Sequence, residues 1–329
     1  MNPLPEELRR RVRGTPVLPA HLRPWVRRTP LLPAPDLAEA LGRPVWLKHE
    51  QFQETGSFKL RGAVNFLKGG GEGVVTCSSG NHGRAVAWTA RALGIPATIC
   101  VPRWVDPVKR EAMEEAGALV RLEGESYDEA EAAALALARE EGLRFVPPFD
   151  DPEVIAGQGT LALEVLEVLG REVEGDLLIP LSGGGLAAGC VQAVEGTGLR
   201  PVGVSASRAP VMLRSLEAGE PVEVPEEETV ASALSGGIGI PNRWTFPILK
   251  QAWDQGRFPV RVVEEEAIRG AMRYAALELK VLLEGGGATA LAAVHSGDAF
   301  LREREGPVVV LLTGGNLAPE TLIEVLCKR

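Results

Sequence analysis

Residues 56–59 read Gly-Ser-Phe-Lys, and residues 78–83 read Ser-Ser-Gly-Asn-His-Gly. The first stretch places a lysine, Lys59, on a turn of small residues, and the second is a turn of small polar residues. Two similar turns follow, Ser-Gly-Gly-Gly-Leu at 182–186 and Leu-Thr-Gly-Gly-Asn at 312–316. The four turns together predict the walls of a single cofactor pocket.

Short apolar or β-branched runs alternate with segments of helical period along the chain. This alternation favours an α/β fold with mostly parallel sheets. Such apolar strands are expected to be covered on both faces. The expected strands are 45–47, 73–77, 97–101, 118–122, 177–181, 201–204, 258–263 and 308–312. The expected helices are 57–67, 81–93, 107–116, 126–141, 159–169, 185–195, 264–279 and 288–296.

Two proline-containing stretches, Pro-Pro at 147–148 and Asp-Asp-Pro at 150–152, interrupt this pattern near the middle of the chain. We place one domain boundary there and another near residues 43–46. We therefore expect a small α/β domain over 47–148 and a large cofactor-binding α/β domain formed by 1–46 plus 149–329. The cofactor would lie in the cleft between them.

The composition excludes several classes of protein. The chain has 329 residues and a formal net charge of −9, which argues against a general nucleic-acid binder. Its longest apolar runs, such as 308–312, are far below the about 20 residues of a membrane-spanning helix. Residues 1–13 are charged and lack an apolar core, so we expect no secretory signal there. The four cysteines form no Cys-x-x-Cys pair and are interpreted as free thiols, which favours a cytoplasmic protein.

Lys59 is the strongest candidate for a covalent cofactor link. A lysine that forms an imine must be held in a fixed, partly desolvated place so that its amine can be neutral and nucleophilic. Lys59 begins a helix pattern beside Phe58, whose ring could pack near a cofactor. From its position alone, Lys59 also fits an ordinary lysine on a surface helix.

The glycine run at 182–186 is a candidate anion site, since it follows an apolar strand and opens a helix. Such a turn presents backbone N–H groups and the positive end of a helix to a phosphate. An ordinary strand–helix turn is the alternative, because glycine triplets also occur at 69–71 and 285–287.

The order and the residues of the four turns resemble those of the pyridoxal-phosphate (PLP) enzymes of the tryptophan-synthase-β-like fold, fold type II. Within them, the chain is most similar to the serine/threonine dehydratase (threonine deaminase) and serine racemase branch. The resemblance covers residues 30–316. It implies two open, twisted, mostly parallel sheets flanked by helices, with PLP in the cleft between a large and a small domain. It also implies a homo-oligomer, either a dimer or a tetramer.

The resemblance implies a role for each turn. The catalytic residues would be Lys59, which holds the cofactor as an imine and then removes the α-proton, and Ser79. For His82, a general base is one possibility, and a wall or capping histidine is the interpretation that we favour. The expected cofactor contacts are Phe58, Lys59, Asn81, Ser182, Gly183, Gly184, Gly185, Leu186 and Thr313. The expected substrate contacts are Ser78, Ser79, Gly80, Asn81 and His82.

Thr313 stands where relatives carry the Ser or Cys that meets the pyridine nitrogen. A neutral hydroxyl does not hold that nitrogen protonated as a carboxylate would, so the ring is a weaker electron sink, which suits elimination of a β-leaving group.

The chain departs from the family pattern at two places that bear on function. Ser205 and Val211 replace a carboxylate pair of racemase-like relatives, so we predict no metal site. Residues 231–233 read Ala-Ser-Ala instead of Ala-Asp-Gly, so the substrate preference is not carried over.

The function implied is a PLP-dependent ammonia-lyase that converts L-threonine to 2-oxobutyrate and ammonia, and L-serine to pyruvate. The alternative is a serine racemase, with or without dehydratase activity. Ser79 matches the motif of racemase-type relatives, Ser-Ser-Gly-Asn-His. In those relatives the hydroxyl of this second serine can return a proton on the cofactor face opposite the lysine. The lysine and asparagine turns fit cysteine synthase and threonine synthase poorly. A cofactor-binding or amino-acid-sensing protein without turnover is a third class. We expect a small amino-acid substrate and neither a nucleic acid nor a membrane as partner.

Overall fold

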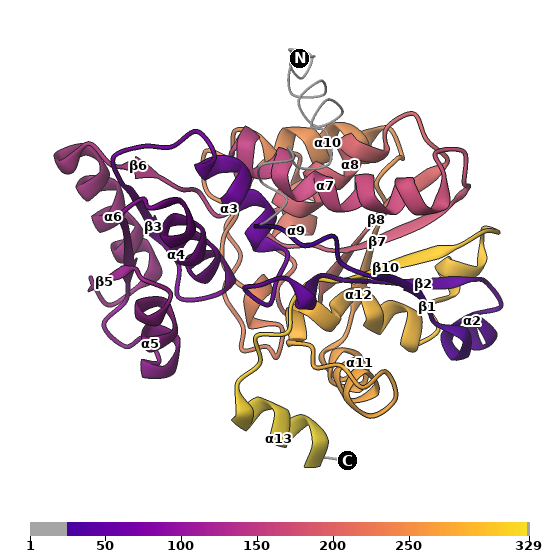
Figure 1. Cartoon of the computed structure of the whole chain (residues 1–329). Coiled ribbons are helices and arrows are strands. Elements are labelled where there is room, and N and C mark those ends of the chain that lie inside the picture. Colours follow the sequence, from indigo (N-terminus) through magenta and orange to yellow (C-terminus); the bar gives the residue numbers. More distant parts are fainter. Residues whose placement is uncertain (1–24, 328–329) are drawn as a thin grey trace.

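The computed structural model describes residues 25–327, so the stretch 1–13 considered above lies outside the described residues. The chain forms two sheets flanked by helices (Figure 1). In the larger sheet only the first strand is antiparallel to its neighbour, and the smaller sheet is parallel throughout. The predicted α/β fold of two mostly parallel sheets is therefore confirmed. The larger sheet has the order β1 (Leu31–Pro33), β2 (Val45–His49), β10 (Val308–Leu312), β7 (Gly175–Pro180), β8 (Leu199–Ala206), β9 (Val260–Val263). The smaller sheet has the order β5 (Leu119–Leu122), β4 (Ala97–Val101), β3 (Val74–Cys77), β6 (Arg144–Phe145).

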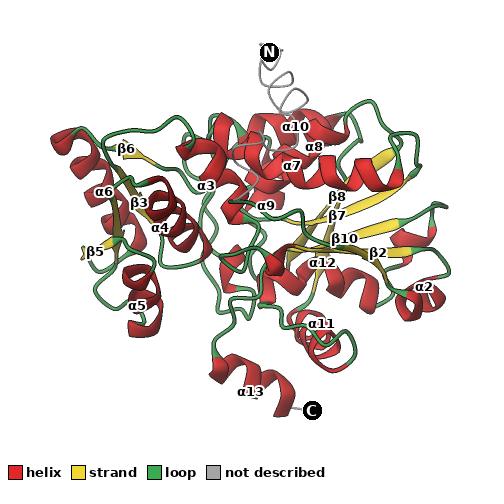
Figure 2. Ribbon diagram, in the orientation of Figure 1, coloured by secondary structure: helices red, strands yellow, loops and turns green. Residues whose placement is uncertain are grey.

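Helices cover both faces of each sheet, as Figure 2 shows. One face of the larger sheet packs against α7 (Pro152–Leu169), α8 (Gly185–Val194), α9 (Val211–Ala218) and α10 (Thr245–Asp254). Its other face packs against α2 (Pro35–Leu41), α11 (Glu265–Leu277) and α12 (Gly285–His295). The smaller sheet lies between α4 (Asn81–Leu93) with α5 (Pro107–Glu115) and, on the opposite face, α6 (Tyr127–Glu141). The remaining elements are α3 (Lys59–Leu67), α13 (Pro319–Cys327) and the 3₁₀ turns η1 (Glu50–Phe52), η2 (Ser232–Leu234) and η3 (Ala299–Arg302).

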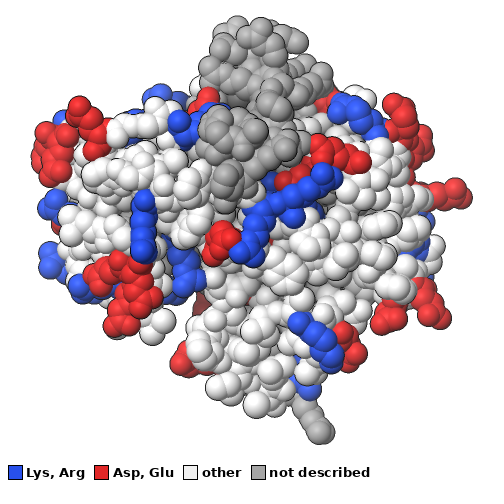
Figure 3. Space-filling model, viewed as in Figure 1, with Lys and Arg blue, Asp and Glu red and all other residues white. Residues whose placement is uncertain are grey.

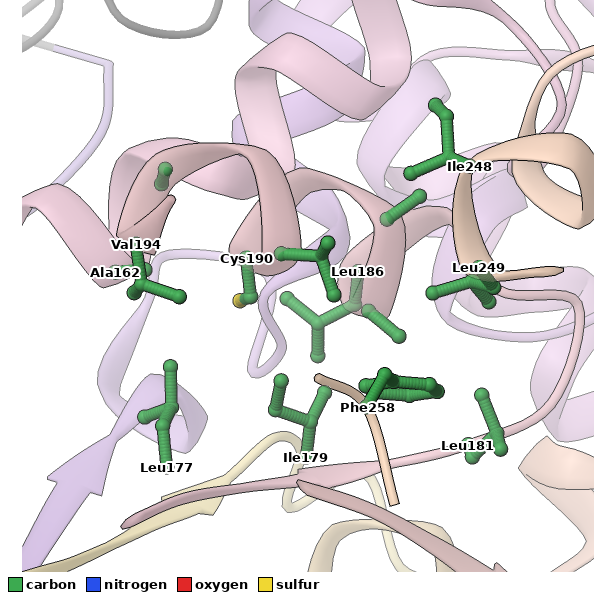
Figure 4. Packing of buried hydrophobic residues seen from close by; sticks show 14 of the residues in the cluster. Ala162, Leu177, Ile179, Leu181, Leu186, Cys190, Val194, Ile248, Leu249 and Phe258 are labelled. Atoms are coloured by element: carbon green, nitrogen blue, oxygen red, sulfur yellow. The ribbon is translucent and has the colours of Figure 1, made fainter. Parts of the chain in front are cut away.

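Strand β7 shows why the central strands read as continuous apolar runs. Leu177 and Ile179 point to the same side of the sheet, where Leu177 faces Ala162 and Val194 and Ile179 lies below Leu186 (Figure 4). Leu178, between them, belongs to the core on the opposite face. Successive side chains of a strand point to opposite faces, so a strand covered on both sides needs an apolar residue at every position.

Helix α7 begins at Pro152, well before the expected start at 159. The carboxylate of Asp151 accepts hydrogen bonds from the N–H groups of Glu153 and Val154, at 2.7 and 3.2 Å. This side-chain cap and the proline at the first helical position are both favourable helix starts. The elements that sequence patterns did not predict are β1, β6, α2, α9, α10 and α13.

The expected small-domain segment 47–148 contains all four strands of the smaller sheet. The boundary at residue 47, however, cuts through β2, and every residue of β2 pairs with β10 of the larger sheet. Strand pairing therefore favours a small domain that begins after β2.

A buried ionic network ties α3 to the larger domain. The Arg61 guanidinium donates to the carboxylates of Glu50 and Glu164, both at 2.7 Å. Lys48 Nζ donates to Glu164 at 2.5 Å and to the Thr29 carbonyl at 2.7 Å. All four charged side chains are buried, and the two cations balance the two anions. The network joins β2, η1, α3 and α7, and so fixes the first turn of α3.

Charged side chains elsewhere are mixed in sign over the face seen in Figure 3. Within residues 25–327, no helix has both the length and the apolar character needed to span a membrane. The same described part of the chain holds no group of three or more His, Cys, Asp and Glu side chains suited to a metal ion.

Replacing Arg61 with methionine should destabilise the fold strongly, because two buried carboxylates would then share one lysine. We expect Arg61→Met to lower the free energy of unfolding by about 3–5 kcal/mol. The control is Arg110→Met, which breaks an exposed pair with Glu114 and should cost less than about 1 kcal/mol. Urea unfolding of both variants measures the difference, and equal losses would contradict a structural role for the network.

Candidate active site

The turn that carries Lys59 is held against the end of strand β10. Ser57 forms an isolated antiparallel bridge with Gly314, and Phe58 N–H donates to the Thr313 carbonyl at 3.0 Å. Gly56 has a φ of +73°, and a Cβ there would lie 2.4 Å from the Asn316 side chain. The Gly-Ser-Phe-Lys turn and the Leu-Thr-Gly-Gly-Asn turn therefore form one backbone unit, although some 250 residues separate them.

The Lys59 amine is half-buried at the first position of α3. Its Nζ donates to the Pro148 carbonyl at 2.7 Å and lies 5.4 Å from the centre of the Phe58 ring. Burial lowers the pKa of Lys59 from 10.5 to about 8. This amine has a substantial neutral fraction near neutral pH, as a nucleophile requires.

Asn81 begins helix α4 and is held from two sides. Its Nδ2 donates to Glu284 Oε1 at 2.5 Å, and its Oδ1 accepts from Asn316 Nδ2 at 2.6 Å. Burial raises the pKa of Glu284 to about 7, although its hydrogen bond with Asn81 opposes this shift. Asn81 therefore joins the smaller domain to the start of α12 and to the turn after β10.

His82 favours the wall interpretation over the general base. Its ring is buried, and Nε2 lies 3.0 Å from the Val146 carbonyl. Burial, and then the charge of Lys59, lowers the pKa of His82 to about 3. Beside a carbonyl oxygen, Nε2 of a neutral imidazole must be the donor, so it cannot accept a proton there.

The serines of the same turn have local partners. Gly80 N–H donates to Ser78 Oγ at 3.2 Å, and Ser79 Oγ shares a short hydrogen bond with Tyr127 Oη. Gly83 is required by the tightness of the turn, because a Cβ there would lie 2.2 Å from the Ser78 carbonyl oxygen.

The glycine loop 182–186 connects β7 to α8. Gly184 has a φ of +88°, and a Cβ on Gly183 would lie 2.5 Å from the Phe149 ring. The first amides of α8 have no acceptor within the helix, and the helix dipole adds positive potential there. The loop is thus suited to an anion. The Ser182 hydroxyl, however, donates to the Leu234 carbonyl at 2.8 Å, so it is already engaged within the protein.

The segment 148–150 links the lysine to the glycine loop. The Pro148 carbonyl receives Lys59, the Phe149 ring packs on Gly183, and the Asp150 carboxylate accepts from the N–H groups of residues 243–245 at 2.7–2.9 Å. Sequence patterns indicated a break here and did not predict these contacts.

Thr313 lies at the end of β10 and is buried, with Oγ1 3.5 Å from the Gly286 carbonyl. A Cβ on Gly287 would lie 2.1 Å from the Gly314 carbonyl oxygen. The glycine triplet 285–287 therefore allows α12 to begin against the turn that carries Thr313. The contacts described above bring together all four turns predicted from the sequence.

The chain matches the family model of pyridoxal-phosphate dependent enzymes over residues 22–314. The chain belongs to this family. Its cofactor is therefore PLP, as the family resemblance implied. An L-threonine ammonia-lyase of Geobacter sulfurreducens is 40% identical over 331 aligned positions, which cover 98% of this chain and 76% of that protein.

Solved structures give the same relationship for this PLP enzyme. The processed form of threonine deaminase isoform 2 from Solanum lycopersicum superimposes with a TM-score of 0.87 at 30% identity, covering 98% of this chain and 93% of that chain. Maize serine racemase superimposes with a TM-score of 0.85 at 29% identity, covering 98% and 96%. The fold is therefore fold type II, in the dehydratase and racemase branch.

The lowered pKa of Lys59 predicts the pH dependence of cofactor attachment. Only the neutral amine attacks an aldehyde, so the rate of imine formation by cofactor-free enzyme and PLP should rise with pH and level off above a midpoint near 8. Stopped-flow absorbance measures this rate, with N-acetyl-lysine amide as the unburied control. A midpoint near the ordinary lysine value of 10.5 would contradict the desolvated environment.

Proposed function

We propose that this enzyme is a threonine/serine ammonia-lyase, which converts L-threonine to 2-oxobutyrate and ammonia, and L-serine to pyruvate and ammonia. The observation that carries the proposal is the Lys59 amine, which has a lowered pKa and lies where four turns meet. The 40% identity to an L-threonine ammonia-lyase over 98% of this chain supports the same reaction.

The residues present fit the cofactor. Lys59 would hold PLP covalently, and Phe58 would lie beside its ring. The amides of residues 183–186 would hold its phosphate, Asn81 would meet its phenolic oxygen, and Thr313 would meet its pyridine nitrogen. When bound, PLP supplies an electron sink for the substrate α-carbon. Since the Ser182 hydroxyl is engaged with Leu234, we assign the phosphate to the loop amides alone.

The turn at 78–82 would bind the substrate carboxylate. Amides at the start of a helix favour an anion, and Ser78, Ser79 and Gly80 directly precede the first turn of α4. A carboxylate held there would bring the α-carbon within reach of Lys59. The neutral Lys59 amine would then remove the α-proton, after which the β-hydroxyl leaves.

Lys59 has the right surroundings for this base. It donates to a neutral carbonyl, and its pKa shift has burial as its cause, without a carboxylate partner among the described residues. With its pKa lowered to about 8, the amine can alternate between accepting and releasing a proton near physiological pH.

A serine racemase is the second candidate, and Ser79 favours it. Its hydroxyl supplies a second acid–base group in the substrate turn, and the solved serine racemase of maize covers nearly the whole chain. Racemisation and dehydration are distinguished by chiral analysis of the products formed from L-serine. D-serine without 2-oxoacid would favour the racemase over the lyase.

We further propose that the enzyme is a cytoplasmic homo-oligomer, a dimer or tetramer, that acts on free amino acids and binds neither nucleic acid nor membrane. The four free cysteines and the net acidic charge support this setting. Size-exclusion chromatography with light scattering tests the oligomeric state.

Lys59→Ala should abolish both cofactor attachment and catalysis. We expect loss of the visible imine absorbance and a fall of at least about 10²–10⁴-fold in ammonia release from L-threonine. The control is Lys250→Ala, which removes an amine paired with Asp254 on α10 and should leave both readouts unchanged. An unaltered imine spectrum in Lys59→Ala would refute the assignment.

A further inference from the structure

Ser79 and Tyr127 form a hydrogen-bonded pair that the lyase reaction leaves unused. Ser79 Oγ and Tyr127 Oη share a short hydrogen bond, in which either oxygen can be the donor. The two side chains differ in access to water. Ser79 is 8% exposed, whereas Tyr127 is 42% exposed. The pair therefore leads from the substrate turn to solvent.

The phenol ring of Tyr127 is held in place by its neighbours. It packs edge-on against Trp104, with ring centroids 5.4 Å apart and planes at 88°. The Trp104 indole N–H donates to the Glu125 carbonyl at 2.9 Å. The backbone of Tyr127 is tied to the substrate turn, since its carbonyl lies 3.7 Å from Cys77 Sγ, one residue before Ser78. The start of α6 is thus held against the turn that carries Ser79.

This geometry matters for the chemistry of Ser79. An isolated serine hydroxyl rotates freely and, once it has given up a proton, has no means of regaining one in a buried site. A phenol fixed beside it sets the direction of the hydroxyl proton and can replace that proton. Chains of hydrogen bonds also polarise one another in a partly buried site.

We propose that Tyr127 is a positioning and proton-relay residue for Ser79. When Ser79 Oγ gives its proton to the substrate α-carbon, the Tyr127 hydroxyl gives its proton to Ser79. A water molecule at the exposed edge of Tyr127 then restores the phenol. The transfers balance over one inversion: one proton enters from solvent and ends in the new C–H bond, and the proton that Lys59 removed from the α-carbon returns from Lys59 to solvent. The inference rests on the proposed function of the Lys59 site and determines how much substrate is reprotonated instead of dehydrated.

The two reactions depend on this pair differently. Dehydration requires Lys59 to remove the α-proton and the β-hydroxyl to leave, and it takes no proton from Ser79. Inversion at the α-carbon requires a proton donor other than Lys59. Loss of the Tyr127 hydroxyl should therefore lower formation of D-serine selectively.

The test compares the holoenzyme with Tyr127→Phe, which keeps the ring and its contact with Trp104. Tyr274→Phe is the matched control, because it removes the hydroxyl of the chain's only other tyrosine, on α11. D-serine and pyruvate are measured from L-serine. We expect Tyr127→Phe to lower D-serine formation about 10-fold and pyruvate formation less than about 2-fold. Ser79→Ala and the double variant should lose inversion to the same extent, since one path cannot be broken twice.

A crystal structure of Tyr127→Phe gives a readout independent of activity, in which the Ser79 side chain should occupy more than one rotamer. The relay is overturned if wild-type enzyme releases pyruvate without any D-serine, if Tyr127→Phe lowers both products in step, or if Ser79 keeps one rotamer. Failure of the proposed function differs from these outcomes. It would appear as absence of imine absorbance and of ammonia release in the wild-type enzyme, and the relay would fall with it.

Discussion

The position of the reactive lysine depends on the buried guanidinium of Arg61. Helix α3 leaves the larger domain and packs against α4 of the smaller one, so Lys59 lies on an element shared by both. Arg61, two positions after Lys59, is bound by the carboxylate of Glu50, directly after β2, and by the carboxylate of Glu164 on α7 of the larger domain. Removing four charges from water is costly, and the cost is offset because every charge is paired and hydrogen-bonded. Together with the hydrogen bond from Phe58 N–H to the Thr313 carbonyl, this network holds the first turn of α3 against the end of β10.

The other turns of the site depend on glycine residues that pack closely against a backbone carbonyl or an aromatic ring. Gly83 packs on the Ser78 carbonyl, Gly183 on the Phe149 ring and Gly287 on the Gly314 carbonyl, and none of these places has room for a Cβ. Amide N–H groups bind an anion only if the chain approaches it closely, which explains why glycine recurs at such turns. The glycines at 285–287 likewise allow a close approach, here of α12 to the turn after β10. This approach places Glu284 within hydrogen-bond distance of Asn81.

The sequence was sufficient for the fold and for the four turns, because both are local signals. Leu177, Leu178 and Ile179 have to be apolar on both faces of a covered strand, and this pattern is visible without knowledge of the partners. The predicted boundary at residue 47 divides β2, which pairs with β10 some 260 residues later, and no local pattern reports that pairing. The early start of α7 had a readable signal in Asp151 and Pro152, which were not interpreted as the start of a helix. The contacts of Pro148 and Tyr127 depend on where the chain folds back, so sequence alone could not supply them.

The charges around Lys59 suggest why this site suits a cofactor that carries its own negative charge. Lys59 donates to a carbonyl, Thr313 is neutral, and His82 is held neutral by burial. Glu284, whose carboxylate accepts a hydrogen bond from Asn81, has its pKa raised to about 7 by burial and is only partly ionised near neutral pH. These groups would therefore repel a phosphate bound by the glycine loop only weakly. Its negative charge would be stabilised by the amides at the start of α8 rather than by a basic side chain. Because those amides cannot give up a proton, the proton transfers of the site are left to Lys59 and to groups in the substrate turn.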